Sequence, residues 1–415
     1  MADAIRHVIV TGGRGYLGRA FVEAARAAGL RVTLLARGAA PRDGLRSVDW
    51  RLGDGLPAQA LADDLAPREQ ALVHFAHDWR DLRDEGANVA GSRALCDGAR
   101  ASGLGRFVFI SSQSARQDAL NAYGRMKWRI EQMLDGANEV SLRVGLVYGG
   151  PREAQYGLLC KAVGLTSLMP MVRPHQLVQP ILRDEVARGA LNAVQSDLSG
   201  ALGLAGASPI PFSQFLDTLA RLTRGGGVTL APIPIAPTLL LCDIVNALPL
   251  LPNVDRERVL GLAGTRSMET AHDLARLGLD VLSFEDGMAR EPIARKAMLR
   301  EAHILLRYIL RAKPGASLLR RYVRACEAKG ARGAMRLPFV ARRAPALLRF
   351  VEPFGARSEL SKRLKIATAL AETSDEGARL GATGGGVSRL AGLALDGVLD
   401  ILAAPTRLIA TALRS

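Results

Sequence analysis

The chain has 415 residues, a formal net charge of +15 and 48% hydrophobic residues, but few aromatic ones. This length is sufficient for two or three domains with substantial cores. No stretch reaches the ~20 uninterrupted apolar residues of a membrane-spanning helix, and the first apolar run is too short for a secretory signal. We therefore expect a globular, cytoplasmic protein whose four scattered cysteines are reduced thiols and form no metal site.

Strand-like and helix-like segments alternate through the first 150 residues. Strands are expected at residues 5–11, 31–36, 71–76, 107–111 and 140–147, and helices at 17–28, 88–101 and 122–134. Short β-branched strands that alternate with longer helices predict a parallel sheet covered on both faces. The expected fold class is α/β, with a doubly wound parallel sheet of the Rossmann type.

Two further regions follow this sheet. Residues 151–290 are less regular and richer in proline, and predict a smaller α/β substrate-binding lobe with helices near 184–193 and 212–222. Residues 291–415 carry 23 Lys and Arg against 10 Asp and Glu, which is almost the whole charge imbalance. This last region predicts a basic helical C-terminal extension, with helices at 294–311, 318–328, 344–351 and 390–403.

A glycine-rich loop, TGGRGYLG at residues 11–18, joins the first expected strand to the first expected helix. Gly12 permits a tight turn, Gly15 lets the backbone approach a pyrophosphate, and Gly18 allows the helix to pack close to the strand. Backbone N–H groups and the positive end of the helix then face the phosphates. Residues 1–150 are thus expected to bind a dinucleotide. The other loop residues expected at the cofactor are Arg14, Tyr16 and Leu17.

A second motif, Tyr123-Gly-Arg-Met-Lys127, places a tyrosine and a lysine on one face of a helix. The unperturbed tyrosine pKa of about 10 is too high for a base near neutral pH. An adjacent ammonium group and an oxidised nicotinamide both favour the phenolate, so Tyr123 could move a proton while a hydride moves to or from the cofactor. Lys127 is also expected to bind the nicotinamide ribose.

The order of these motifs resembles the extended short-chain dehydrogenase/reductase superfamily, which includes the NAD-dependent epimerase/dehydratase family, over about residues 5–290. The resemblance implies hydride transfer at a hydroxyl or carbonyl carbon, with Tyr123 as acid/base and Lys127 tuning it. It places substrate orientation on Ser112, with Ser114 as the alternative. It also implies that Asp54, in a GDG segment, contacts the adenine, and that Phe75 and Ala76 lie beside the cofactor.

The second expected strand ends at Arg37 with no acidic residue to accept the ribose hydroxyls. Arg37 suits a 2′-phosphate instead, so NADP is favoured over NAD. The sequence departs from the family pattern at two places, one near the nicotinamide and one in the loop that contributes to the substrate pocket. Val144 stands where proline is usual, and the loop between Ser112 and Tyr123 is short for an enzyme acting on a nucleotide sugar.

Three functions remain open from the sequence. The first is an NAD(P)-dependent oxidoreductase or epimerase acting on a small molecule such as a nucleotide sugar. The second is an NADP(H)-dependent carbonyl reductase for an apolar or lipid-like substrate, in line with the apolar segment at residues 231–252. The third is a non-catalytic, dinucleotide-binding assembly subunit.

The basic extension has few aromatic residues to stack on bases, which argues against a nucleic-acid partner. Two roles stay open for residues 291–415. The extension either contacts the inner membrane surface peripherally, or forms a helical cap or a homodimerisation arm with a solvated basic face.

Overall fold

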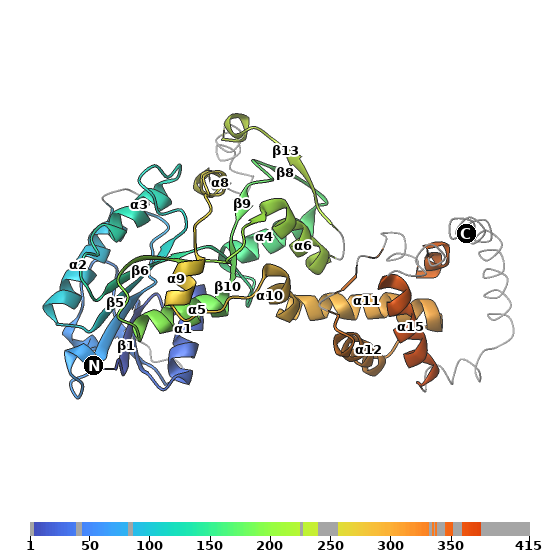
Figure 1. Ribbon diagram of the computed structural model, residues 1–415, viewed down its shortest axis with the longest axis horizontal. Coiled ribbons are helices and arrows are strands. Elements are labelled where there is room, and N and C mark those ends of the chain that lie inside the picture. The colour runs from blue at the N-terminus through green and yellow to red at the C-terminus, as the bar shows by residue number, and fades with distance from the viewer. Residues whose placement is uncertain are drawn as a thin grey trace. The chain divides into compact units, whose positions relative to one another are not determined.

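The computed structural model describes residues 4–38, 44–81, 86–224, 227–239, 256–331, 334–335, 337, 345–351 and 359–374. The chain divides into two compact units (Figure 1). Unit 1 comprises residues 1–162, 168–216 and 229–287, and unit 2 comprises 163–167, 217–228 and 288–415. The helix expected at 390–403 lies outside the described residues. Within the described part of the chain, every helix is too short or too polar to cross a bilayer.

Unit 1 is built on a seven-stranded parallel sheet with the order β11-β6-β5-β4-β1-β2-β3. The strands are β1 His7–Thr11, β2 Arg31–Ala36, β3 Arg46–Asp49, β4 Gln70–His74, β5 Arg106–Ser112, β6 Glu139–Val144 and β11 Gly200–Leu204. The chain winds outward from β1 in both directions, so the strand order reverses between β1 and β4. Ligands bind at this reversal in open α/β sheets. The doubly wound Rossmann fold predicted from the sequence is confirmed.

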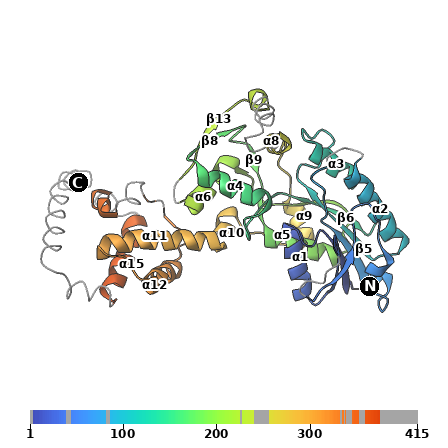
Figure 2. The same ribbon diagram turned by 180° about the vertical axis from the view of Figure 1, so that it is seen from behind.

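Helices cover both faces of this sheet (Figures 1 and 2). Helices α1 (Tyr16–Ala27) and α5 (Arg183–Val194) pack on one face, and α2 (Ala87–Ala101) and α3 (Ala122–Glu131) on the other. Successive residues of a strand point to opposite faces. In β1, Val8 belongs to the core under α1 and α5, whereas Ile9 belongs to the core under α2 and α3. Burial on both faces explains why these strands read as continuous apolar runs.

The region expected as one strand at residues 140–147 is interrupted at Gly145. Strand β6 stays in the main sheet, while β7 (Leu146–Tyr148) leaves it and pairs in parallel with β10 (Pro180–Leu182). A Cβ atom at Gly145 would overlap the carbonyl oxygen of Gln179. Only glycine lets the chain pass this point, and the sequence expectation of a single strand was wrong here.

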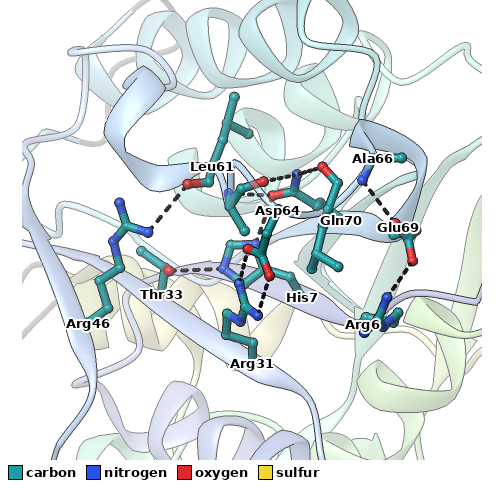
Figure 3. A network of polar contacts seen from close by, with 12 residues as sticks. Arg6, His7, Arg31, Thr33, Arg46, Leu61, Asp64, Ala66, Glu69 and Gln70 are labelled. Carbon is teal, nitrogen blue, oxygen red and sulfur yellow. Dashed lines mark hydrogen bonds and ion pairs between the residues drawn. The ribbon is translucent and has the colours of Figure 1, made fainter.

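A polar network lies where the strands begin, at the opposite end of the sheet from the glycine loop (Figure 3). The ring nitrogens of His7 bond the side-chain oxygens of Gln70 and Thr33, both at 2.9 Å. The Gln70 amide also bonds both backbone groups of Ala62 and the carbonyl oxygen of Leu65. Burial is the main cause that lowers the pKa of His7, which favours a neutral ring with a structural role.

The remaining helices and strands up to residue 290 belong to unit 1 or contribute residues to both units. They are η1 Ala58–Ala60, η2 Pro67–Glu69, α4 Ala154–Leu165, β8 Leu168–Met171, β9 Leu177–Val178, β12 Ile210–Pro211, α6 Phe212–Arg224, β13 Thr229–Pro232, α8 Arg256–Ala263, α9 Ala271–Arg276 and α10 Phe284–Arg290.

Unit 2 is helical. Helices α11 (Pro292–Leu310), α12 (Ala316–Ala328) and α15 (Glu359–Glu372) pack against one another around a separate apolar core, with η3 (Pro345–Leu347) and α14 (Leu348–Val351) beside them. Inside this core, the Tyr322 hydroxyl donates to Glu301 at 2.6 Å, and Arg363 pairs with the same carboxylate at 3.2 Å. This buried pairing fixes the three helices to one another.

Candidate active site

A cleft with a volume of about 1320 Å³ opens at the carboxyl ends of the central strands of unit 1. Its wall includes the glycine loop, the ends of β2 and β5, the start of α3 and residues of α8. The predicted site residues that line it are Gly12, Arg14, Gly15, Tyr16, Leu17, Gly18, Arg37, Phe75, Ala76, Ser112, Ser114, Tyr123 and Lys127. The structure thus brings both motifs to one cavity.

The glycine loop is shaped by contacts that leave no room for side chains at two positions. Gly12 has a φ of +66°, and a Cβ atom there would lie 2.7 Å from the backbone nitrogen of Ala76. A Cβ atom at Gly18 would overlap the carbonyl oxygen of Gly12. Gly15 sits in extended conformation directly before α1. The first turn of α1 therefore lines the cleft directly after the glycine loop.

Asp54 is not among the residues that line the cleft, so the structure does not bring it to the site with the other predicted residues. Its carboxylate accepts a hydrogen bond from the backbone N–H of Arg51 at 2.7 Å and stabilises its own turn. Trp50, Arg51 and Leu52, just before it, line the cleft instead.

Two arginines meet where β2 ends. The Arg14 guanidinium donates to the carbonyl oxygens of Arg37 at 2.9 Å and Gly38 at 3.1 Å. The Gly38 N–H in turn donates to the Asp49 carboxylate at 2.8 Å, which lies at the end of the unexpected strand β3. Asp49 is outside the residues that line the cleft, whereas Arg14 and Arg37 line it. The cleft wall at this point is therefore positively charged.

Helix α3 carries the tyrosine and lysine of the second motif, and the Asn121 side chain caps its first turn. The Lys127 ammonium donates to the carbonyl oxygen of Ile110 at 2.7 Å and lies 5.8 Å from the centre of the Tyr123 ring. Burial lowers the pKa of Lys127 to about 7, although the Glu131 carboxylate acts in the opposite direction. The carbonyl oxygen of Ile110 thus holds the Lys127 side chain beside the ring of Tyr123.

Tyr123 hydrogen bonds to the side chain of Ser112, whose hydroxyl also lies 2.9 Å from that of Ser114. Burial raises the pKa of Tyr123 to about 12, and the bond to Ser112 opposes this shift only in part. The sequence motif favoured a lowered pKa. In the chain by itself, desolvation of the phenol outweighs the hydrogen bond to Ser112, so the phenol is protonated at neutral pH.

Two aromatic residues that the sequence analysis did not assign to the site surround this phenol. The Trp79 indole stacks on Tyr123, with ring centres 5.1 Å apart and 17° between the planes. His77 meets both rings edge to face, at 4.5 Å and 5.1 Å. Burial, with Lys127 next in size, lowers the pKa of His77 to about 3. Trp79 is 59% exposed, so it presents an apolar surface at the mouth of the site.

His74, at the end of β4, is buried inside unit 1 and has a packing role. Its ring nitrogens bond the Thr11 hydroxyl at 2.6 Å and the Ser92 hydroxyl at 3.0 Å. The ring is buried, and burial lowers its pKa to about 3. Among the described residues, no group of three or more His, Cys, Asp or Glu side chains is placed to hold a metal ion.

Residues of α8 and the segment after it form another wall, which no sequence motif predicted. Arg256, Glu257, Gly261, Leu262 and Thr265 line the cleft about 130 positions after the second motif. Buried Gln113 ties this segment to the sheet, because its amide donates to the carbonyl oxygen of Arg266 at 2.7 Å. Only the tertiary fold brings these residues to Tyr123.

Sequence comparison finds similarity to known proteins in the first part of the chain. Residues 8–153 match the model of the NAD dependent epimerase/dehydratase family. Ceramide reductase of Caulobacter vibrioides is 31% identical over 153 residues, which are 35% of this chain and 48% of that protein. dTDP-glucose 4,6-dehydratase of Streptomyces niveus is 32% identical over 126 residues, 25% of this chain and 37% of that protein. The chain spans less than half the length of these curated relatives.

Solved structures share the fold at lower identity. Human epimerase family protein SDR39U1 with NADPH has a TM-score of 0.51 and 19% identity, covering 67% of this chain and 95% of that one. MoeE5 in complex with UDP-glucuronic acid and NAD has a TM-score of 0.51 and 17% identity, covering 70% and 99%. At these identities the likeness shows the fold alone. The similarity of this chain to the NAD dependent epimerase/dehydratase family thus extends over residues 8–153, and its fold is shared with these solved structures.

Proposed function

We propose that the cleft of unit 1 binds NAD(P) and that the protein is an oxidoreductase of the extended short-chain type. The observation that carries this proposal is the meeting of Ser112, Tyr123 and Lys127 in the cavity that the glycine loop lines. The names of the two curated relatives support an enzyme of this type, since one is named a reductase and the other a dehydratase. Two structural neighbours were solved with NADPH or NAD.

The residues of the cleft fit a dinucleotide with a 2′-phosphate. The loop of Gly12, Gly15 and Gly18 offers backbone N–H groups without side chains in the way. Arg14 and Arg37 offer two guanidinium groups at the end of β2, and arginine binds phosphate oxygens well. NADP is therefore favoured over NAD. When bound, the nicotinamide would supply or accept the hydride, and Lys127 would hold its ribose.

Tyr123 is the acid in the direction of reduction. Its high pKa keeps the phenol protonated, so the O–H can donate a hydrogen bond to a substrate carbonyl oxygen. As the carbonyl carbon gains a hydride, the phenolic proton passes to that oxygen, which gives the alcohol. Ser112 orients the same oxygen, and the nearby Lys127 ammonium stabilises the resulting phenolate.

Two substrate classes fit the cleft, and one of them has support in the structure. A nucleotide sugar is the first, in line with the dehydratase relative. An apolar or lipid-like carbonyl compound is the second, in line with the ceramide reductase relative. Exposed Trp79 stacks on Tyr123, and Leu120, 48% exposed, directly precedes Asn121 in the cleft wall. Apolar surface beside the reacting position favours the second class.

We further propose that the protein acts in the cytoplasm and that its basic C-terminal extension contacts a membrane peripherally. The alternative role of this extension, a homodimerisation arm, predicts a two-fold oligomer. Sedimentation of the full chain decides between a monomer and a homodimer.

The test compares wild type with Tyr123→Phe, using Tyr308→Phe in α11, outside the residues that line the cleft, as a matched hydroxyl-loss control. NADPH consumption is measured with a 4-keto nucleotide sugar and with a long-chain ketone, and NADPH affinity is measured by fluorescence. Tyr123→Phe is expected to lose about 100-fold or more in turnover, while its dissociation constant for NADPH stays close to that of wild type. Full turnover by Tyr123→Phe contradicts the catalytic role. Lost NADPH binding in a folded variant contradicts it as well.

A further inference from the structure

The first two helices of unit 2 carry surface charge of one sign. Residues 288–331, which include α11 and α12, contain eleven Lys and Arg, and all eleven are exposed. The same stretch has three acidic residues. Glu291 and Glu301 are buried, which leaves Glu327 as the single exposed carboxylate of this stretch. An ordinary solvated surface mixes both signs, so this imbalance requires an explanation.

Helix α12 shows how the charge is arranged. Leu318, Tyr322, Val323 and Cys326 are buried in the core of unit 2. Arg320, Arg321 and Arg324 are exposed on the other side, at spacings of three and four residues that place them on one face. Neither Arg320 nor Arg324 makes an ion pair with another described residue, and Arg321 makes only a 3.5 Å contact with the Thr373 hydroxyl. The core holds this helix, so its three guanidinium groups are presented on a fixed support.

We infer that the arginine face of α12, formed by Arg320, Arg321 and Arg324, binds anionic phospholipid at a membrane surface. Cationic side chains next to an anionic leaflet gain affinity with each charge added. Described residues on this face include no aromatic side chain, which nucleic-acid bases would need for stacking.

This inference rests on the peripheral membrane contact proposed above for the C-terminal extension and assigns it to one face of α12. It is independent of the proposed catalytic function, because vesicle binding can be measured without substrate or cofactor. The full-length protein is sedimented with vesicles of phosphatidylcholine alone and of phosphatidylcholine mixed with phosphatidylglycerol. Wild type is expected to bind only the mixed vesicles, and added salt should weaken the binding. The triple variant R320E/R321E/R324E is expected to bind them about tenfold more weakly or worse.

Two controls make the result specific. R26E/R68E/R93E reverses three exposed arginines of unit 1 and should bind the mixed vesicles like wild type. R320Q/R321Q/R324Q removes the three positive charges without adding negative ones. It tests the same arginine face if the triple glutamate variant fails to fold. Equal binding of wild type to both kinds of vesicle overturns the inference. So does wild-type affinity in either α12 variant, or displacement of the mixed vesicles by transfer RNA at equal charge concentration.

Discussion

The Glu257 carboxylate accepts a hydrogen bond from the backbone N–H of Ala122 at 2.7 Å. This bond joins α8 to the first turn of α3, one residue before Tyr123. The first N–H groups of a helix have no partner within the helix, and a carboxylate there is favoured by the helix dipole. A residue far along the sequence thus holds the end of the helix that carries the proposed acid.

Replacing Glu257 tests whether this bond positions Tyr123. Glu257→Ala leaves the Ala122 N–H without its acceptor and should cost about 1–2 kcal/mol of stability. We expect kcat to fall while the dissociation constant of NADPH stays unchanged, because the glycine loop is untouched. Glu257→Gln retains an acceptor oxygen and should restore most of kcat. Equal kcat in Glu257→Ala and wild type would show that the bond is not needed for positioning.

The choice of cofactor depends on the two arginines at the end of β2. Arg37→Ala should weaken NADPH binding by about tenfold or more, since it removes a charge-assisted phosphate contact, and should leave NADH binding nearly unchanged. Arg14→Ala should do the same, with an added loss of stability because the Arg14 guanidinium also bonds two backbone carbonyl groups. Titration of each variant with both dinucleotides measures the effect. Parallel losses for NADPH and NADH would contradict a 2′-phosphate site.

Acid should destabilise unit 1 through buried His74. Its pKa is about 3 in the folded chain against an ordinary value of 6.5, so the unfolded state binds more protons between these values. Stability is then complete above pH 6.5 and is lost as the pH falls. At about pH 5 the loss from this one residue approaches 2 kcal/mol. Urea unfolding followed by tryptophan fluorescence at two pH values measures it, since all three tryptophans lie in unit 1.

The comparison for this pH effect is His74→Gln, which keeps side-chain hydrogen bonding but cannot be protonated. Its stability should change less between neutral pH and about pH 5, by roughly the 2 kcal/mol assigned to His74. If the free energy of unfolding of His74→Gln fell with pH as steeply as that of wild type, other groups would cause the acid sensitivity.

The polar network at the amino ends of the strands should matter for stability alone. Gln70→Leu leaves backbone groups of Ala62 and Leu65 and the ring of His7 without partners (Figure 3). We expect a cost of about 2–4 kcal/mol and no change in NADPH affinity, because the network lies at the opposite edge of the sheet from the cleft. Gln195→Leu, which removes one bond to Ile5, should cost less.

Apolar, locally encoded features were predictable from the sequence. The buried strands and the helices between them appear within a few residues of their expected bounds, because their composition reflects burial on both faces. Strand β3 was missed because Arg46–Asp49 is a polar, partly exposed edge strand with no apolar signal. Helix α15 was missed because its apolar residues are interrupted by charged ones, including Arg363, which is buried and pairs with Glu301 and Glu359.

The residues of the candidate site also divide into those that a local motif predicted and those that only tertiary packing brings in. The glycine loop and the Tyr123-Lys127 pair could be predicted because each is a short motif within one strand–helix connection. Trp79 and His77 follow β4 and were not assigned to the site from the sequence, although they surround the Tyr123 phenol. Glu257 reaches Ala122 only through the packing of α8 on α3, a contact between distant segments that no local pattern encodes.

The measurement that tests the central claim most directly is dinucleotide binding by the purified protein. The protein is denatured, any released dinucleotide is identified, and empty protein is titrated with NADPH and NADH. We predict binding of NADPH in preference to NADH, and loss of binding in Gly18→Leu, whose side chain would overlap Gly12, but not in the control Gly164→Ala. Tightly held NAD would contradict the role of Arg37 and indicate an enzyme that returns its hydride in each cycle. Binding of neither dinucleotide by folded wild type would contradict the account as a whole.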